Sequence, residues 1–311
     1  MAILLALIFV ALLLLVSGGY VFFVACGRGK EISWLVKEEV EPTPYGKYYE
    51  CILESDRWLA EHHAQDVYIS SRDELKLHGL WVPAPNPRGT VLLVHGYRST
   101  KLVDFGVAFD FYHTRGINLL IPDQRCHGLS EGRYITFGVK ESGDILEWIA
   151  YHNQNFGMKP MLVSGLSMGA STVMYLADEV LPANVKVIIA DCGYTSPWDI
   201  ISRVFKRVTH LPASPTVWVA DIFAQLLAGF GLKDKDSRIT LAKNKLPILL
   251  VHGTKDDFVP CYMTEESYAF CTGPKQLLLV EGAEHGVSFL VDHERYVAEV
   301  ERLLKIALEE Q

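Results

Sequence analysis

The sequence lacks the marks of several protein classes. No two of its six cysteines have Cys-x-x-Cys spacing, so neither a zinc site nor a dense disulfide framework is expected. It has no block of lysine and arginine, and its formal net charge is −8, which argues against nucleic acid as a partner. No internal repeat or low-complexity tract is present. What remains is a chain of 311 residues, 50% hydrophobic and 21% charged, which is a globular composition.

The N-terminal segment lacks charged side chains altogether. The run from Met1 to Cys26 contains none, and about 20 apolar residues suffice to cross a bilayer as a helix. We therefore expect residues 1–27 to be a single-pass transmembrane anchor. Two alternatives stay open: a signal peptide cleaved near Ser17, or a lipoprotein signal with Cys26 lipidated. Both normally carry a basic region ahead of the apolar run, and none is present here.

The orientation of this anchor stays open. Arg28, Lys30 and Lys37 follow the span and nothing basic precedes it. By the positive-inside rule, this pattern places the rest of the chain in the cytoplasm. Four glutamates lie among these basic residues and weaken the pattern: Glu31, Glu38, Glu39 and Glu41. The sequence therefore does not decide which side of the membrane the remaining chain faces.

Residues 28–63 are expected to form a polar linker followed by a short membrane-proximal amphipathic helix. From residue 64 onward, short apolar runs alternate with helical patterns. The expected strands cover 66–70, 75–82, 90–96, 117–123, 160–165, 185–193, 246–253 and 275–282. The main expected helices cover 102–113, 139–153, 168–181, 264–271 and 293–308.

This alternation predicts an α/β fold for residues 64–311. Runs that are apolar on both faces suit strands buried in a mostly parallel central sheet, with helices covering its two faces. Residues 197–245 interrupt the pattern with a long, mostly helical stretch. We expect it to form a small helical cap over the C-terminal edge of the sheet, where open α/β folds bind their ligands.

The strongest local motif is GLSMG, which spans Gly165 to Gly169. It follows an expected strand and opens an expected helix, which is the setting of a nucleophile elbow with Ser167 as nucleophile. A serine hydroxyl needs a base at neutral pH. His285, in a loop after the last expected strand, is the best candidate, since this fold places its histidine after the serine and the acid.

The acid that orients the histidine has three candidates in the sequence. Asp256 and Asp257 stand side by side in VHGTKDDFVP, after the strand that ends at Gly253. Adjacent side chains of an extended chain point to opposite sides, so one of the two can face the histidine and the other cannot. Asp191 follows the preceding strand and remains a rival.

An oxyanion hole is expected from two backbone N–H groups, those of Met168 and Tyr97. Met168 opens the helix after the nucleophile, and Tyr97 follows the glycine of VHGY. His95 in that motif is interpreted as shaping the loop. The polar cluster Asp123, Arg125 and His127, in PDQRCHGLSEG, is interpreted as charge-paired support of neighbouring loops and not as a second reactive centre.

Taken together, VHGY, DQRCHGLS, GLSMG, HGTKDDFVP and AEHG resemble the α/β-hydrolase superfamily. The similarity is strongest to its serine aminopeptidase-like and monoacylglycerol lipase-like branch, and in particular to membrane-anchored bacterial members. The motifs span Val94 to Gly286 in family order. The family spacing selects Asp256 as the acid. Two departures are visible: Cys126 stands where the family usually has glycine, and Glu74 occupies a turn position where glycine is common.

The resemblance implies two-step acyl transfer by Ser167, His285 and Asp256, with no cofactor and no metal. We expect a serine hydrolase of small to medium acyl esters, including lipid-derived ones. The expected partners are a small-molecule acyl ester and the membrane, while the oligomeric state is unknown. The expected cap contains no glutamate, whereas aminopeptidase relatives usually grip the α-ammonium group with carboxylates. A serine peptidase or amidase remains the alternative, as does, in another class, a non-catalytic membrane-tethered binding protein.

Overall fold

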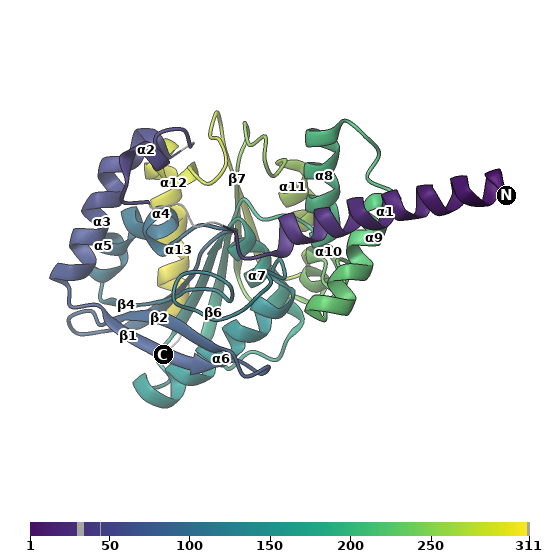
Figure 1. Cartoon of the computed structure of the whole chain (residues 1–311). Coiled ribbons are helices and arrows are strands. Elements are labelled where there is room, and N and C mark those ends of the chain that lie inside the picture. Colours follow the sequence, from purple (N-terminus) through teal and green to yellow (C-terminus); the bar gives the residue numbers. More distant parts are fainter. Residues whose placement is uncertain (30–33, 44, 310–311) are drawn as a thin grey trace.

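The central feature of the fold is an eight-stranded sheet in the order β1-β2-β4-β3-β5-β6-β7-β8 (Figure 1). A computed structural model describes residues 1–29, 34–43 and 45–309 of the chain. Strands β1 and β2 pair antiparallel, β2 pairs antiparallel with β4, and all other neighbours pair in parallel. The strands are β1 (Gln65–Ser70), β2 (Lys76–Val82), β3 (Gly89–Val94), β4 (Ile117–Pro122), β5 (Met161–Leu166), β6 (Val185–Asp191), β7 (Ile248–Gly253) and β8 (Lys275–Val280).

The α-helices of the described residues include every helix that the sequence predicts. They are α1 (Ala2–Cys26), α2 (Lys37–Val40), α3 (Tyr49–Glu61), α4 (Lys101–Phe105), α5 (Phe109–His113), α6 (Val139–Phe156), α7 (Met168–Tyr175), α8 (Pro197–Thr209), α9 (Thr216–Phe223), α10 (Ser237–Thr240), α11 (Tyr262–Phe270), α12 (Ser288–Val291) and α13 (His293–Glu309). The one helix expected at 102–113 is divided into α4 and α5 by a 3-10 turn, Gly106–Ala108.

Helices cover both faces of the sheet, because successive residues of a strand point to opposite sides. Val91 and Leu93 of β3 belong to one core, with Phe109 of α5 and residues of α13. Leu92 of the same strand belongs to the other core, with Trp148 of α6 and residues of α7. The predicted α/β-hydrolase fold with a mostly parallel sheet is confirmed.

The expected cap is helical. Between β6 and β7 the chain forms α8, α9, a π-helical turn at Ala224–Ala228, α10 and a 3-10 turn at Leu241–Lys243. The N-terminal helix α1 projects from the body on this side, and its C-terminal part lies beside α9 (Figure 1). Among residues 1–29, 34–43 and 45–309, α1 is the one helix long and apolar enough to cross a membrane.

The segment expected as a polar linker contains buried side chains. Trp34, Val40 and Ile52 form a small apolar cluster with Val103 of α4. Residues 30–33 and 44, which belong to the expected linker and include Lys30 and Glu31, lie outside the described part of the chain. The described remainder therefore packs onto the α/β body.

Candidate active site

Ser167 occupies a sharp corner between β5 and α7. Its backbone has φ 57° and ψ −115°, a conformation that residues with side chains adopt rarely. The glycines on either side are required by close contact. A Cβ at Gly165 would clash with the carbonyl oxygen of Gly169, and one at Gly169 would clash with that of Val94. The corner thus holds the serine in a strained position at the carboxyl end of the sheet.

His285 joins Ser167 to Asp256. Its Nε2 lies 2.9 Å from Ser167 Oγ, and its Nδ1 lies 2.6 Å from Asp256 Oδ2. Ser167 is 5% exposed and Asp256 is 6% exposed. The histidine is partly exposed, and the ring of Phe258 packs edge-on against it at 5.1 Å. The structure therefore brings together the three side chains that the sequence singled out.

Asp256 is held as a carboxylate. Its Oδ1 accepts hydrogen bonds from the backbone N–H groups of Phe258 and Val259, both at 2.9 Å. Burial by itself would raise the pKa of Asp256, but hydrogen bonds from His252 and His285 outweigh it and lower the pKa to about 2. The acid is thus ionised and lies in hydrogen-bond contact with His285.

His252 is a supporting residue that sequence reasoning did not single out. It is fully buried, and its Nε2 lies 2.8 Å from the carbonyl oxygen of Val259 and 3.2 Å from Asp256 Oδ2. Both partners are acceptors, so Nε2 carries a proton. Its Nδ1 lies 2.7 Å from Thr264 Oγ1. The one sequence feature that could have pointed to His252 is its position in VHG, four residues before Asp256.

The other two acid candidates lie elsewhere. Asp257 is exposed, and its backbone carbonyl accepts a hydrogen bond from Arg207 Nη1 at 2.6 Å. Asp191 is buried, and its Oδ1 accepts from Ser288 Oγ at 3.3 Å. Of the three, Asp256 is the one in hydrogen-bond contact with His285.

The loop after β3 lies directly against Ser167, since a Cβ at Gly96 would be 3.1 Å from Ser167 Cβ. The peptide between Gly96 and Tyr97 is oriented by His95. Burial lowers the pKa of His95 to about 3, and its Nε2 accepts from the backbone N–H of Gln124 at 3.0 Å. The neutral ring therefore carries its proton on Nδ1 and donates it to the carbonyl oxygen of Gly96 at 2.8 Å.

This hydrogen bond has a consequence for Tyr97. In a trans peptide the C=O and the following N–H point in opposite directions. Fixing the carbonyl of Gly96 therefore fixes the N–H of Tyr97 on the other side of the peptide. The N–H of Gly96 itself donates to Asp104 Oδ2 at 2.6 Å. Met168, as the first residue of α7, has an N–H that the helix does not use.

The motif DQRCHG supports the same loop from its far side. His127 Nε2 accepts from the backbone N–H of Arg98 at 2.9 Å, and its Nδ1 donates to the carbonyl of Arg125 at 2.9 Å. Asp123 accepts from Lys101 and His78, and Arg125 pairs with Asp73 and Asp144. Cys126 has φ 66°, the left-handed region that favours glycine. This explains why glycine is common at that position in the family.

The end of α1 reaches the loop after β3. The last carbonyls of a helix have no partner within the helix. Tyr97 Oη donates to the carbonyl of Ala25 at 2.8 Å, while Arg98 Nη2 donates to those of Val24, at 2.8 Å, and Gly27, at 2.9 Å. A single bridge between Gly27 and Tyr134 continues the contact. The N-terminal helix is therefore attached to the loop that carries Tyr97.

Two buried carboxyl groups lie beneath the site. Asp104 and Asp191 both line a hollow of about 30 Å³, together with Gly286. Burial raises the pKa of each to about 6. Hydrogen bonds to Asp104 lower its pKa in part, and the charge of His252 does the same for Asp191. Tyr45, from the segment expected as a linker, reaches the neighbouring loop, since a Cβ at Gly286 would clash with its hydroxyl.

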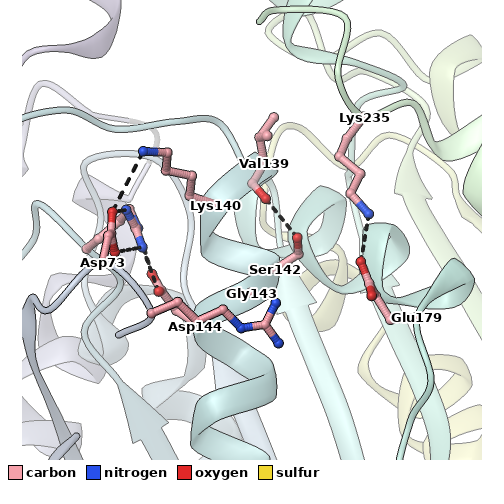
Figure 2. A pocket seen from close by; sticks show the side chains of 10 residues that line it. Asp73, Val139, Lys140, Ser142, Gly143, Asp144, Glu179 and Lys235 are labelled. Carbon is pink, nitrogen blue, oxygen red and sulfur yellow. Dashed lines mark hydrogen bonds and ion pairs between the residues drawn. The ribbon is translucent and has the colours of Figure 1, made fainter. Parts of the chain in front are cut away.

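A larger cleft of about 300 Å³ lies elsewhere and is lined mainly by charged side chains. Figure 2 shows Lys140 directed at Asp73 and Lys235 directed at Glu179, at 3.7 and 3.0 Å. The residues that line it include none of Ser167, Asp256 and His285. Because its lysines contact its own carboxylates, we interpret the cleft as a surface ion-pair network.

The donor set around the histidine suits a metal poorly. Cys192, Asp256 and His285 place potential ligand atoms within 4.8 Å of one another. A cysteine binds a metal as its thiolate. Burial, and to a smaller extent the charges of Asp191 and Asp256, raise the pKa of the Cys192 thiol well above its ordinary value, so the thiolate is disfavoured. Asp256 and His285 already bind each other. The arrangement is suited instead to a nucleophile, a base and an orienting carboxylate.

The chain is similar in sequence and in fold to known proteins. Residues 85–219 match the family model described as serine aminopeptidase, S33. The chain is 26% identical to the uncharacterized protein YqkD of Bacillus subtilis, over 73% of this chain and 75% of that one. It is also 26% identical to alpha/beta hydrolase domain-containing protein 17B of Xenopus tropicalis, over 73% and 69%. The solved structure of the Pyrococcus furiosus esterase Pf2001 superposes with a TM-score of 0.65 and 26% identity, covering 80% of this chain and 92% of that one.

Proposed function

We propose that the chain, which is similar to serine aminopeptidases over residues 85–219, is a serine hydrolase of carboxylic esters with small to medium acyl chains, including lipid-derived ones. The observation that carries this proposal is the position of His285 between Ser167 Oγ and Asp256 Oδ2. The similarity to an esterase of known structure supports hydrolysis of esters.

The proposed reaction passes through an acyl-enzyme. His285 Nε2 takes the proton of Ser167 as Oγ attacks the ester carbonyl, and Asp256 stabilises the imidazolium. The N–H groups of Tyr97 and Met168 stabilise the oxyanion. His285 then gives its proton to the departing alcohol. A water molecule, deprotonated by the same histidine, releases the acid and restores Ser167.

The cap favours ester over aminopeptidase substrates. An α-ammonium group needs an available carboxylate. Within residues 193–245, all of which the structure describes, each carboxylate already accepts a hydrogen bond or ion pair from a neighbouring residue of the chain. These are Asp199 and Asp236 with Arg238, Asp221 with the N–H of Leu232, and Asp234 with the N–H of Gly231.

We also propose that α1 spans a membrane as a single-pass anchor. It has 25 residues, of which those ahead of Gly18 are largely exposed, and exposed apolar helices of this length suit lipid and not water. Residues 28–63 and 64–311 then form the membrane-proximal segment and the hydrolase domain.

The choice between ester and amide is tested with the full-length protein in detergent. We expect p-nitrophenyl esters of short acyl chains to be hydrolysed at least about 100-fold faster, in kcat/KM, than aminoacyl p-nitroanilides. Ser167→Ala should remove both activities, whereas Ser70→Ala, at an exposed serine of β1, should leave them unchanged. Faster hydrolysis of the anilides would make the protein a peptidase.

A further inference from the structure

One face of the C-terminal part of α1 is packed against the cap and is not free to contact lipid. A Cβ at Gly18 would clash with Val219 Cβ of α9, and one at Gly19 would be 3.3 Å from the ring of Phe223. The two glycines thus allow the helices to approach closely. Phe22 is 1% exposed and stacks on Phe223 with 6.2 Å between ring centroids. From Gly18 onward, one face of α1 is therefore buried by the cap.

The part of α1 that remains free is short for a bilayer. Residues 2–17 rise about 24 Å at 1.5 Å per residue, whereas the hydrocarbon core of a bilayer is about 30 Å thick. Any tilt of the helix shortens its span further. A bilayer that takes up α1 must therefore extend past Gly18, to the level at which α9 lies beside it (Figure 1).

The cap presents an apolar surface at that level. Trp218, Ile222 and Leu226 recur at intervals of four residues and are exposed, while the opposite side of the helix, including Val217 and Ala224, is buried. Val219 and Phe223 of α9 face α1, and Leu227 continues this row. Each of the three exposed residues comes one position before a residue of this row. One residue turns a helix by about 100°, so the exposed stripe lies about 100° around α9 from α1. Val208, Leu211 and Leu227 extend it and are also exposed.

The charge of this region suits an anionic surface. In a chain of formal net charge −8, residues 200–233 contain four lysines and arginines and one acidic residue, Asp221, which is buried. Lys233 Nζ lies 3.9 Å from the ring centroid of Trp218 and 4.1 Å from that of Trp198. Tryptophan and lysine side chains together are typical of the boundary between headgroups and acyl chains.

We propose that the outer face of α9, the π-helical turn and the end of α8 form a lipid-docking surface that lies in the boundary layer of an anionic bilayer beside α1. The defining residues of this surface are Val208, Leu211, Trp218, Ile222, Leu226 and Leu227. The proposal rests on the proposed function for its substrate class: Ser167 acts on an ester whose acyl chain resides in that bilayer.

The interior of the cap supports this substrate class. A single buried apolar cluster includes Phe22 of α1, Val217 of α9 and Met168, the residue after Ser167. Apolar side chains thus continue from the membrane side of the cap to the nucleophile. The side chains between the lipid-docking surface and Ser167 are therefore apolar, which suits an acyl chain better than a charged substrate.

The test uses the full-length protein reconstituted in vesicles of phosphatidylcholine and phosphatidylglycerol. Ile222→Glu and Leu226→Glu should each lower hydrolysis of a long-chain 4-methylumbelliferyl ester held in the vesicles at least tenfold, and leave hydrolysis of water-soluble p-nitrophenyl acetate within twofold. Ile239→Glu is the matched control, because Ile239 is similarly exposed but lies on α10, which packs on α7 and α11. Equal rates for all variants on both esters would overturn the proposal.

A second measurement does not depend on activity. In vesicles with dibrominated acyl chains, bromine quenches the fluorescence of tryptophans that lie in the bilayer. The inactive variant Ser167→Ala should therefore be quenched more than the double variant that also carries Trp218→Phe. Unchanged quenching would overturn the docking surface even if the enzyme is active. If the protein hydrolyses neither ester, the proposed function fails and quenching alone decides on the surface. A dimer in detergent that Ile222→Glu dissociates would assign the face to a second copy and also overturn the proposal.

Discussion

Arg98 donates from Nη2 to the carbonyl oxygen of Val24 at 2.8 Å, and so joins the loop after β3 to the last turn of the N-terminal helix. The residue before it, Tyr97, supplies the proposed oxyanion donor. Helix α1 is therefore in direct contact with the proposed site, and changes at its end are expected to affect the proposed catalysis as well as the proposed membrane attachment.

Arg98→Met keeps much of the apolar stem and removes the hydrogen bonds to Val24 and Gly27. A hydrogen bond from a charged donor contributes roughly 1.5–3 kcal/mol, so a loosened loop should lower kcat about tenfold. KM should change little, because oxyanion donors act mainly in the transition state. Kinetics on a soluble ester in detergent would measure this. Arg72→Met is the control, since Arg72 is exposed and pairs with Glu147. A loss confined to KM would contradict the positioning role.

Asp256→Asn and Asp257→Asn separate the two neighbouring aspartates. Asp256 contacts His285 at 2.6 Å, whereas Asp257 is exposed. Loss of the orienting carboxylate costs on the order of 10⁴-fold in kcat in a serine triad, so Asp256→Asn should show a loss of this size and Asp257→Asn less than about twofold. Comparable losses in the two variants would remove Asp256 from the proposed triad.

The sequence located the sheet well because buried parallel strands are continuous apolar runs. INLLIPD and LPILLVHG each contain one strand, β4 and β7, in which every residue is buried. Motif spacing also brought Ser167, Asp256 and His285 to one place. The strands depend on local sequence, which was sufficient for them, whereas the choice of Asp256 over Asp257 and Asp191 came from the resemblance to the family motif.

Contacts between distant segments were not visible in the sequence. The apolar pattern of α1 is the same whether a residue faces lipid or protein, so nothing distinguished Phe22, which packs on the cap, from exposed Leu4. Tyr45 belongs to a polar, proline-rich stretch that looked like a linker, yet its hydroxyl reaches Gly286. The sequence showed His252 only as part of the VHG motif. Its contact with Asp256 depends on a turn that folds the chain back, and the motif alone does not reveal this turn.

Two glycine substitutions should have opposite effects on stability. In Gly169→Ala the new Cβ would clash with the carbonyl oxygen of Val94, which backbone movement must relieve. We expect a loss above about 3 kcal/mol, at the level of severe overpacking. In Gly143→Ala, inside α6, nothing lies within 4 Å of the new Cβ, and helix propensity predicts a gain of up to about 1 kcal/mol. Thermal unfolding in detergent measures both. Equal shifts would contradict the close packing of the nucleophile corner.

Asp104 should make stability depend on pH. Burial raises its pKa to about 6, against about 3.9 in an unfolded chain. Between these values the unfolded chain binds fewer protons, so stability falls as the pH rises from about 4 to about 6. In Asp104→Asn, the side-chain amide oxygen can still accept from the N–H of Gly96, but the side chain cannot titrate.

The predicted result is that the stability of the unsubstituted protein, relative to Asp104→Asn, declines by up to about 3 kcal/mol between pH 4 and pH 7, at about 1.4 kcal/mol for each pKa unit. Unfolding midpoints across this range measure the decline, with Asp257→Asn as the surface control. A difference between the proteins that does not vary with pH would exclude a raised pKa for Asp104.

The proposed function requires Ser167 to be an activated nucleophile. Its most direct test is labelling of the full-length protein by a fluorophosphonate, with the modified residue located by mass spectrometry of peptides. We expect one equivalent of label on Ser167, no label on Ser167→Ala, and much slower labelling of Asp256→Asn. A folded, unsubstituted protein that takes up no label, or a Ser167→Ala variant labelled as fast as the original, would contradict it.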